Sequence, residues 1–162
     1  MGTFKIIRQT DGELNYLFNA VNYITNKNSY DISGSPNVDT DNAYFQMLCV
    51  KKYFQKTSGN PLFHFVIVHE SRNVYDESQA VYLSKKIAEY FKDRYQVIWS
   101  VHRKGMKAKG KYPGSKYHTH LLINSVSYVD GKMYAGNQRD IYGFLEYIKQ
   151  VTRDKKWIVD HK

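Results

Sequence analysis

Two early stretches of the chain carry apolar residues at three- and four-residue intervals, which is the spacing of one helix face. The inward face of the first, predicted over 13–26, consists of Leu14, Leu17, Phe18, Val21 and Ile24. The inward face of the second, predicted from a cap at Asp41 or Asn42 through 56, consists of Phe45, Leu48, Cys49, Tyr53 and Phe54. Between them, 29–41 is rich in Ser, Gly, Asn, Asp and Pro, and is expected to be a loop.

The rest of the chain alternates between strand and helix patterns. Short apolar runs predict strands at 4–8, 62–68, 96–102, 116–124 and 157–159. Helices are expected from 76 to about 94 and over 141–151, the latter with an inward face of Phe144, Leu145 and Ile148. An Asp-Gly pair at 130–131 predicts a hairpin whose returning arm carries Tyr134. This order predicts an α+β fold, a central and mostly antiparallel β-sheet flanked by helices, in a single domain over 1–162.

Charge and aromatic content favour nucleic acid as a partner. Lys plus Arg exceed Asp plus Glu by 24 to 15, and aromatic residues make up 15% of the chain, with 15 tyrosines. Basic charge attracts phosphates and aromatic faces stack on unpaired bases, so single-stranded nucleic acid fits best. An ordinary basic surface is the alternative.

One cysteine and the lack of a long apolar run bear on the setting of the protein. Cys49 is the sole cysteine, which excludes an internal disulfide, favours a reducing compartment and suggests a buried thiol. No apolar run has the length of a membrane span, and the N-terminus has no signal-peptide pattern. We therefore expect a soluble, cytoplasmic protein without membrane insertion.

Three histidines are the main candidate for chemistry. His118 and His120 are two residues apart in a predicted strand, so both side chains lie on one face. His102 ends the preceding predicted strand, and if the two strands are neighbours the three imidazoles meet. Such a site would bind a divalent ion and leave coordination positions open for phosphate oxygens. The alternative is a surface strand that simply carries polar residues.

A metal site of this kind needs a nucleophile, for which Tyr23 is the candidate. It lies on the polar side of the first predicted helix, near its C-terminal end. A phenol ordinarily has a pKa of about 10, so it needs a nearby cation or base to become a phenolate. A purely structural tyrosine is the alternative.

Basic residues fill the segment 103–116, which is expected to be a flexible loop. Its candidate DNA contacts are Arg103, Lys104, Lys107, Lys109 and Lys111. A solvated loop without a ligand is the other interpretation.

These motifs together resemble the relaxase domain of conjugative and mobilisable elements, the mobilisation nucleases of the HUH endonuclease superfamily. The stretch 17–26 is similar to the family motif that places a tyrosine after an apolar helical run. The stretch 43–68 resembles its helix, glycine-containing turn and strand, with His64 at the usual histidine. The stretch 101–134 resembles the histidine, H-x-H, asparagine and Asp-Gly motif, with Asn124 at the asparagine.

The resemblance implies a metal-dependent nicking and rejoining enzyme with an HUH-relaxase-like sandwich fold. Tyr23 would attack single-stranded DNA at an origin of transfer, forming a 5′-phosphotyrosyl link and releasing a 3′-hydroxyl. His102, His118 and His120 would hold the divalent ion; manganese or magnesium is expected, with zinc, cobalt and nickel as alternatives. Accessory mobilisation proteins would be partners.

One departure from the family pattern bears on activity. The family usually carries an acid two residues after its first histidine, where this chain has Lys104. Glu70, at an even spacing from His64, is a candidate substitute. His64 is itself either a hydrogen-bonded core histidine or a supporting residue, and Asn124 either supports the site or caps the strand.

Two other functions stay open at this stage. A rolling-circle replication initiator of the same superfamily would use a tyrosine after H-x-H, and Tyr142 and Tyr147 are there. A non-catalytic single-stranded-DNA-binding module would fit the basic charge and Lys104. We expect Tyr23→Phe to abolish nicking in a relaxase and Tyr147→Phe to do so in an initiator.

Overall fold

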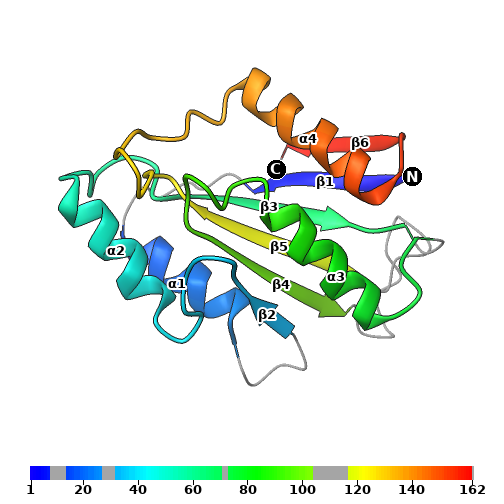
Figure 1. Cartoon of the computed structure of the whole chain (residues 1–162), viewed down its shortest axis with the longest axis horizontal. Coiled ribbons are helices and arrows are strands. Elements are labelled where there is room, and N and C mark those ends of the chain that lie inside the picture. The colour runs from blue at the N-terminus through cyan, green and yellow to red at the C-terminus, as the bar shows by residue number, and fades with distance from the viewer. Residues whose placement is uncertain (8–13, 27–31, 71–72, 104–116, 162) are drawn as a thin grey trace.

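The computed structural model describes residues 1–7, 14–26, 32–70, 73–103 and 117–161. Within these ranges a six-stranded sheet carries helices on both faces (Figure 1). The strands are β1 (Gly2–Ile7), β2 (Ile32–Gly34), β3 (Leu62–Val68), β4 (Val97–Arg103), β5 (Tyr117–Asn124) and β6 (Trp157–His161). The helices are α1 (Leu14–Ile24), α2 (Ala43–Tyr53), α3 (Glu77–Ala88) and α4 (Gln138–Thr152). The predicted α+β fold is confirmed.

The sheet has the strand order β2-β4-β5-β3-β1-β6. Every pair of neighbours is antiparallel except β1 and β6, which run parallel. The H-x-H strand β5 therefore lies inside the sheet, between β3 and β4. None of the four helices in the described part of the chain is long and apolar enough to cross a bilayer.

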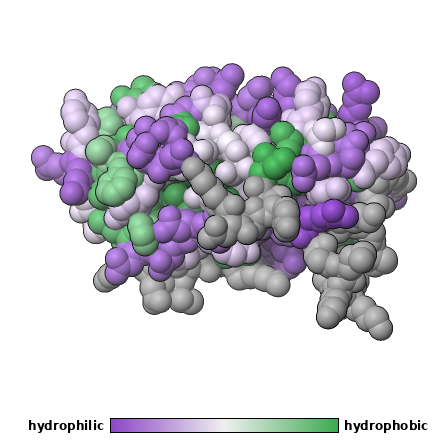
Figure 2. Space-filling model, turned by 90° about the horizontal axis from the view of Figure 1, so that it is seen from below, coloured by the Kyte–Doolittle hydropathy of each residue, from purple (hydrophilic) through white to green (hydrophobic). Residues whose placement is uncertain are grey.

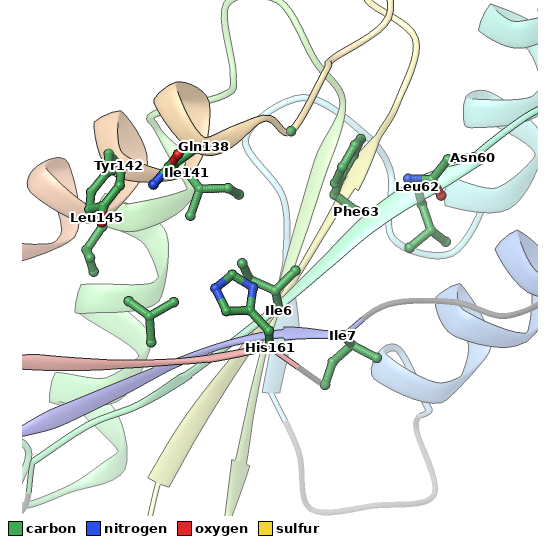
Figure 3. A pocket seen from close by; sticks show the side chains of 12 residues that line it. Ile6, Ile7, Asn60, Leu62, Phe63, Gln138, Ile141, Tyr142, Leu145 and His161 are labelled. Carbon is green, nitrogen blue, oxygen red and sulfur yellow. The ribbon is translucent and has the colours of Figure 1, made fainter.

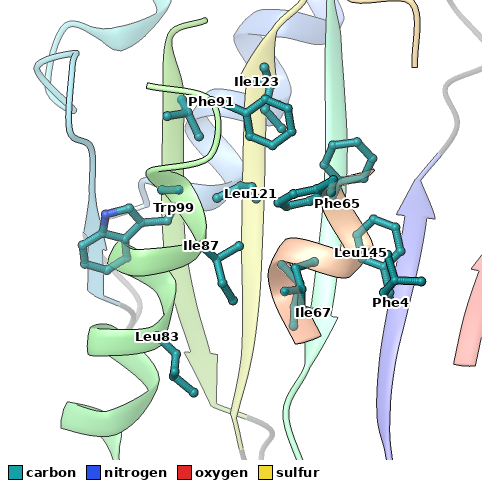
Figure 4. Close-up of a cluster of buried hydrophobic side chains, with 14 of the residues drawn as sticks. Phe4, Phe65, Ile67, Leu83, Ile87, Phe91, Trp99, Leu121, Ile123 and Leu145 are labelled. Atoms are coloured by element: carbon teal, nitrogen blue, oxygen red, sulfur yellow. The ribbon is translucent and has the colours of Figure 1, made fainter. Parts of the chain in front are cut away.

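Alternation along each strand separates two hydrophobic cores. Leu121 and Ile123 of β5 point into the larger core, which lies under α3 and α4 (Figure 4). Leu122 points the other way, into a smaller core that α1 closes with Leu17 and Ile24. Because His118 and His120 share the parity of Leu122, they lie on the α1 face of the sheet.

Three local predictions need correction. The expected loop 29–41 contains β2, which pairs with β4 because Gly34 lets the strand lie flat on the indole ring of Trp99. Helix α3 ends at Ala88 and not near 94. Beyond it the chain forms tighter turns with hydrogen bonds between residues three apart, such as the one from the Phe91 amide to the Ala88 carbonyl. The Asp-Gly turn is present, with Gly131 at φ 70°, but its hairpin arms meet only at one isolated bridge.

The predicted inward face of α2 is also wrong. The helix buries Ala43, Met47 and Lys51, while Phe45 and Tyr53 are 64% and 80% exposed. Cys49, expected to be buried, is exposed as well. Polar contacts at the end of β5 fix this orientation, as the next subsection describes for Asn124.

Candidate active site

Pairing between β4 and β5 brings together His102, His118 and His120, which we call the histidine group. His102 lies directly opposite His118 in the register, and His120 projects from the same face. The ring centroids of His102 and His120 are 4.2 Å apart. One ligand nitrogen from each of the three lies within 4.8 Å of the others. Two nitrogens on one ion are roughly 3–4 Å apart, so small side-chain movements would complete a three-histidine site.

His64 on β3 orients the central histidine of this group. Its Nε2 lies 2.8 Å from Nδ1 of His120. The Nε2 atom of His120 is buried and has no hydrogen-bond partner among the residues described. A metal on that Nε2 requires the proton to be on Nδ1, which then donates to His64. This is the arrangement by which a second residue holds a ligating imidazole in place.

Burial keeps these two imidazoles neutral. Desolvation lowers the pKa of His120 to about 2, helped by its histidine neighbours, chiefly His64. Desolvation likewise lowers the pKa of His64 to about 4, with His102 adding to the effect. Neutral imidazole is the form that ligates a metal, so the donor set fits a divalent ion.

Ser100 was missed by sequence reasoning. It lies opposite His120 on β4, on the same face, and it is fully buried. Its hydroxyl has no hydrogen-bond partner within the described ranges. The signal was available in principle, because a residue two positions before His102 in a strand shares its face.

Tyr23 reaches this group from the overlying helix. Helix α1 packs on the sheet through Leu17, Val21 and Ile24, which places Tyr23 on the flank nearest the histidines. Its ring centroid is 5.6 Å from that of His102 and 5.6 Å from that of His120. The side chain is 58% exposed, so a substrate could approach it from solvent.

The other face of the sheet contains a polar clamp on β5. Thr119, between the two histidines of H-x-H, has its Oγ1 atom 2.7 Å from Nε2 of His69 and 2.7 Å from the hydroxyl of Ser84 in α3. His69 is buried, and desolvation lowers its pKa to about 4. The clamp ties the strand that carries His118 and His120 to a helix on the opposite face.

The other two predicted supporting residues, Glu70 and Asn124, lie at opposite ends of the paired strands β3 and β5. Glu70 follows the end of β3 and forms an ion pair with the N-terminal ammonium group of Met1. Asn124 is fully buried at the far end of β5, where its Nδ2 donates to the carbonyl of Met47 in α2 and to Oε1 of Gln96. Asn124 therefore anchors α2 on the sheet, four residues beyond His120.

Of the five predicted DNA contacts, Arg103 lies within the described residues. Arg103 is exposed and ends β4, opposite Tyr117. The remainder of the basic segment, with Lys104, Lys107, Lys109 and Lys111, lies outside the described residues.

A separate cavity of about 700 Å³ lies on the α4 side of the sheet (Figure 3). Its walls are mostly apolar, with Ile6, Phe63 and Ile141 among them, and Gln138 and His161 add polar groups. Neither Tyr23 nor any residue of the histidine group lines it. The cavity is therefore distinct from the candidate active site.

Comparison with known proteins agrees with this geometry. The family model for the MobA/VirD2-like nuclease domain of relaxases matches residues 16–157, which include Tyr23 and all three histidines. Searches of curated proteins and of solved structures found no match. Since the match spans most of the chain, this protein belongs to the MobA/VirD2-like family of relaxase nuclease domains.

Proposed function

We propose that this domain nicks and rejoins single-stranded DNA at an origin of transfer, with Tyr23 as nucleophile and a divalent ion on His102, His118 and His120. Family membership supports DNA nicking in mobilisation. The observation that carries the finer proposal is the position of the Tyr23 ring, 5.6 Å from two of the three imidazoles. A cytoplasmic setting with accessory mobilisation proteins belongs to the same proposal.

The proposed reaction is a reversible transesterification. The Tyr23 hydroxyl oxygen forms a bond to the scissile phosphorus, and the bond from phosphorus to the 3′-oxygen breaks. The phenol loses its proton and the leaving oxygen gains one, which yields a 3′-hydroxyl and a 5′-phosphotyrosyl link. The link is a phosphodiester, so attack by a 3′-hydroxyl reverses the step without an outside energy source.

The residues around Tyr23 have distinct proposed roles. His102, His118 and His120 would hold the ion, which would polarise the non-bridging oxygens of the phosphate. By accepting a hydrogen bond from Nδ1 of His120, His64 would keep the proton there and leave Nε2 available to hold the ion. Three imidazoles suit manganese, cobalt, nickel or zinc better than magnesium, which prefers oxygen ligands. Manganese is therefore the first ion to test.

The initiator alternative has less support. Tyr142 and Tyr147 both lie on α4, which covers the larger core on the opposite face of the sheet from the histidines (Figure 1). The Tyr147 hydroxyl donates to the carbonyl of Lys86 in α3, 2.9 Å away. Neither phenol is placed to attack a phosphate held at the histidine group.

Covalent capture tests the proposal directly. We would incubate the protein with Mn²⁺ and a library of randomised single-stranded oligonucleotides, and separate adducts on a denaturing gel. The wild type and the Tyr147→Phe variant should form an adduct, and Tyr23→Phe should form none. An adduct that survives in Tyr23→Phe would refute the assigned nucleophile, and the absence of any adduct in the wild type would favour the non-catalytic binding module.

A further inference from the structure

Helix α2 presents its aromatic residues to solvent and a lysine to the interior. Phe45, Cys49 and Tyr53 recur every four residues on the exposed side. Lys51, on the inner side, is only 1% exposed and donates to the hydroxyl of Ser125 at 3.0 Å. Large apolar side chains are usually buried and lysines exposed. A helix with exposed aromatic residues and a buried lysine indicates that its outer face is a binding surface.

The exposed rings continue from α2 onto the helix that carries Tyr23. The ring of Phe18 in α1 contacts that of Tyr44 with centroids 5.2 Å apart, and Tyr44 contacts Phe45 at 5.3 Å. We call Phe18, Tyr44, Phe45 and Tyr53 the aromatic track. Figure 2 views the molecule from the side of these two helices and shows hydrophobic residues gathered at the end where α2 lies. Phe18 precedes Tyr23 by five residues, a rise of about 7.5 Å along the helix and a rotation of about 140° around it.

The surroundings of the track suit a polyanion with aromatic bases. Neither α1 nor α2 contains a carboxylate, although the chain has 15 Asp and Glu. Three exposed asparagines, Asn15, Asn19 and Asn22, line α1, and Lys52 is exposed on α2. Amides hydrogen-bond to base edges, lysine attracts phosphate, and exposed rings stack on unpaired bases.

The exposed area is too small for a stable protein interface by itself. Phe18, Phe45 and Tyr53 together expose roughly 400 Å², given about 200 Å² for a whole aromatic side chain. A standard interface buries about 800 Å² on each partner. Separate rings that each take one base fit the dimensions of the track better than one continuous protein contact.

We propose that the aromatic track binds the single strand next to the cleavage site by stacking its unpaired bases on Phe18, Phe45 and Tyr53. The inference rests on the proposed function for its substrate, because the strand would reach the track from a phosphate held beside Tyr23. It adds a binding surface on α1 and α2, outside the histidine group and outside the basic segment.

Binding of a fluorescent (dT)20 oligonucleotide, measured by anisotropy in a Tyr23→Phe background that removes the proposed chemistry, tests the track. Alanine at Phe18, Phe45 or Tyr53 should weaken binding about fivefold or more for each ring. Tyr82→Ala, an equally exposed position on α3 across the sheet, serves as the matched control and should bind as the parent does. The side chains of Phe45 and Tyr53 are mostly exposed, so their alanine variants should melt at the temperature of the parent.

Two further variants separate stacking from simple apolar contact. Phe45→Trp should bind as well as the parent, whereas Phe45→Leu should bind as weakly as Phe45→Ala because leucine has no π-face. The slope of log affinity against log salt should stay the same in these variants and fall by about 0.7 in Lys52→Gln.

The proposal is overturned if the parent does not bind the oligonucleotide, if the alanine variants bind like Tyr82→Ala, or if Phe45→Leu binds like the parent. The last result would indicate a protein-binding surface. Failure here is distinguishable from failure of the proposed function, because adduct formation by the protein with Tyr23 intact is measured separately. If the adduct forms but the alanine variants bind like the control, only the proposed role of the aromatic track is refuted. If the variants weaken binding but no adduct forms, only the proposed nicking mechanism is refuted.

Discussion

The contact between His64 and His120 is the residue-level detail on which metal binding depends most. It joins two neutral, buried imidazoles from neighbouring strands at 2.8 Å. Residues that hydrogen-bond to a metal ligand set its tautomer and ring orientation. A site whose central ligand is held in this way should lose affinity when the holding residue changes, even though that residue does not touch the ion.

We therefore expect His64→Phe to weaken Mn²⁺ binding by about 10- to 100-fold, since phenylalanine fills the space but accepts no hydrogen bond. Isothermal titration calorimetry measures the change. His161→Phe, in which the replaced histidine is exposed on β6, is the control and should bind Mn²⁺ normally. Equal affinity in the two variants would show that His64 has only a packing role.

Strand parity made the histidine group predictable from the sequence, but it did not determine which residues contact these histidines. His118 and His120 had to share a face, and only the pairing of β4 with β5 was needed to add His102. Glu70, the acid predicted to orient a ligand, forms an ion pair with the N-terminal ammonium group, and His64, also predicted as a possible supporting residue, contacts His120. Which residue of a strand contacts a given neighbour depends on the register between the strands, which spacing along the chain does not determine.

At the scale of elements, α2 shows where sequence patterns are least informative. Its apolar residues are spread around the helix, so the face with Ala43 and Met47 fits the helical spacing as well as the predicted face with Phe45 and Tyr53. Tertiary contacts decided the orientation: the carbonyl of Met47 accepts from Asn124, and Lys51 donates to Ser125. By contrast, α4 has one clear apolar face and was predicted correctly. The predicted face of α1 was right for Leu17, Val21 and Ile24 but wrong for Phe18, which is 47% exposed.

The buried lysine makes stability depend on pH. Desolvation lowers the pKa of Lys51 from 10.5 to about 8. Between these values the unfolded chain binds more protons than the folded one, so the free energy of unfolding rises with pH. Below about pH 8 the folded protein carries a buried charge, which costs roughly 3 kcal/mol.

Lys51→Met should therefore stabilise the protein at pH 7 by about 1–3 kcal/mol, since the lost hydrogen bond to Ser125 offsets part of the gain. Urea unfolding at pH 7 and pH 10 measures the difference from the wild type, which should shrink at the higher pH. Lys52→Met, at the exposed neighbouring position, should differ little from the wild type at either pH. A destabilised Lys51→Met variant would mean that the ammonium group has favourable partners beyond Ser125.

For the whole molecule, metal binding and folding should be linked. The three histidines come from two strands in the middle of the sheet, and they are brought together only when β4 and β5 pair. An ion that binds only the folded state stabilises it by about 2.7 kcal/mol at one hundred times its dissociation constant.

At that concentration Mn²⁺ should raise the melting temperature by about 5–10 °C for a domain of this size. Differential scanning calorimetry with and without the ion, followed by EDTA, measures the shift and its reversal. His118→Ala should show a much smaller rise. If Mn²⁺ leaves the melting temperature of the wild type unchanged, this result would argue against a metal centre at these histidines.

The overall layout was predictable because short apolar runs mark the central strands and helical spacing marks most of the helices that cover them. The strands carry alternating apolar residues that fill cores on both sides, and polar groups interrupt this pattern chiefly at the histidine group and the Thr119 clamp. Short edge elements such as β2 were not predictable, because three residues give no periodic signal and their pairing depends on contact with Trp99.

Peptide mapping of a DNA adduct tests the central claim most directly. The adduct formed with Mn²⁺ and single-stranded oligonucleotides would be digested with nuclease and protease, and the nucleotide-bearing residue located by mass spectrometry. We expect a nucleotide joined through its 5′-phosphate to Tyr23. A nucleotide on Tyr142, Tyr147 or any other residue would contradict the assignment of the phenol above the three histidines as the nucleophile.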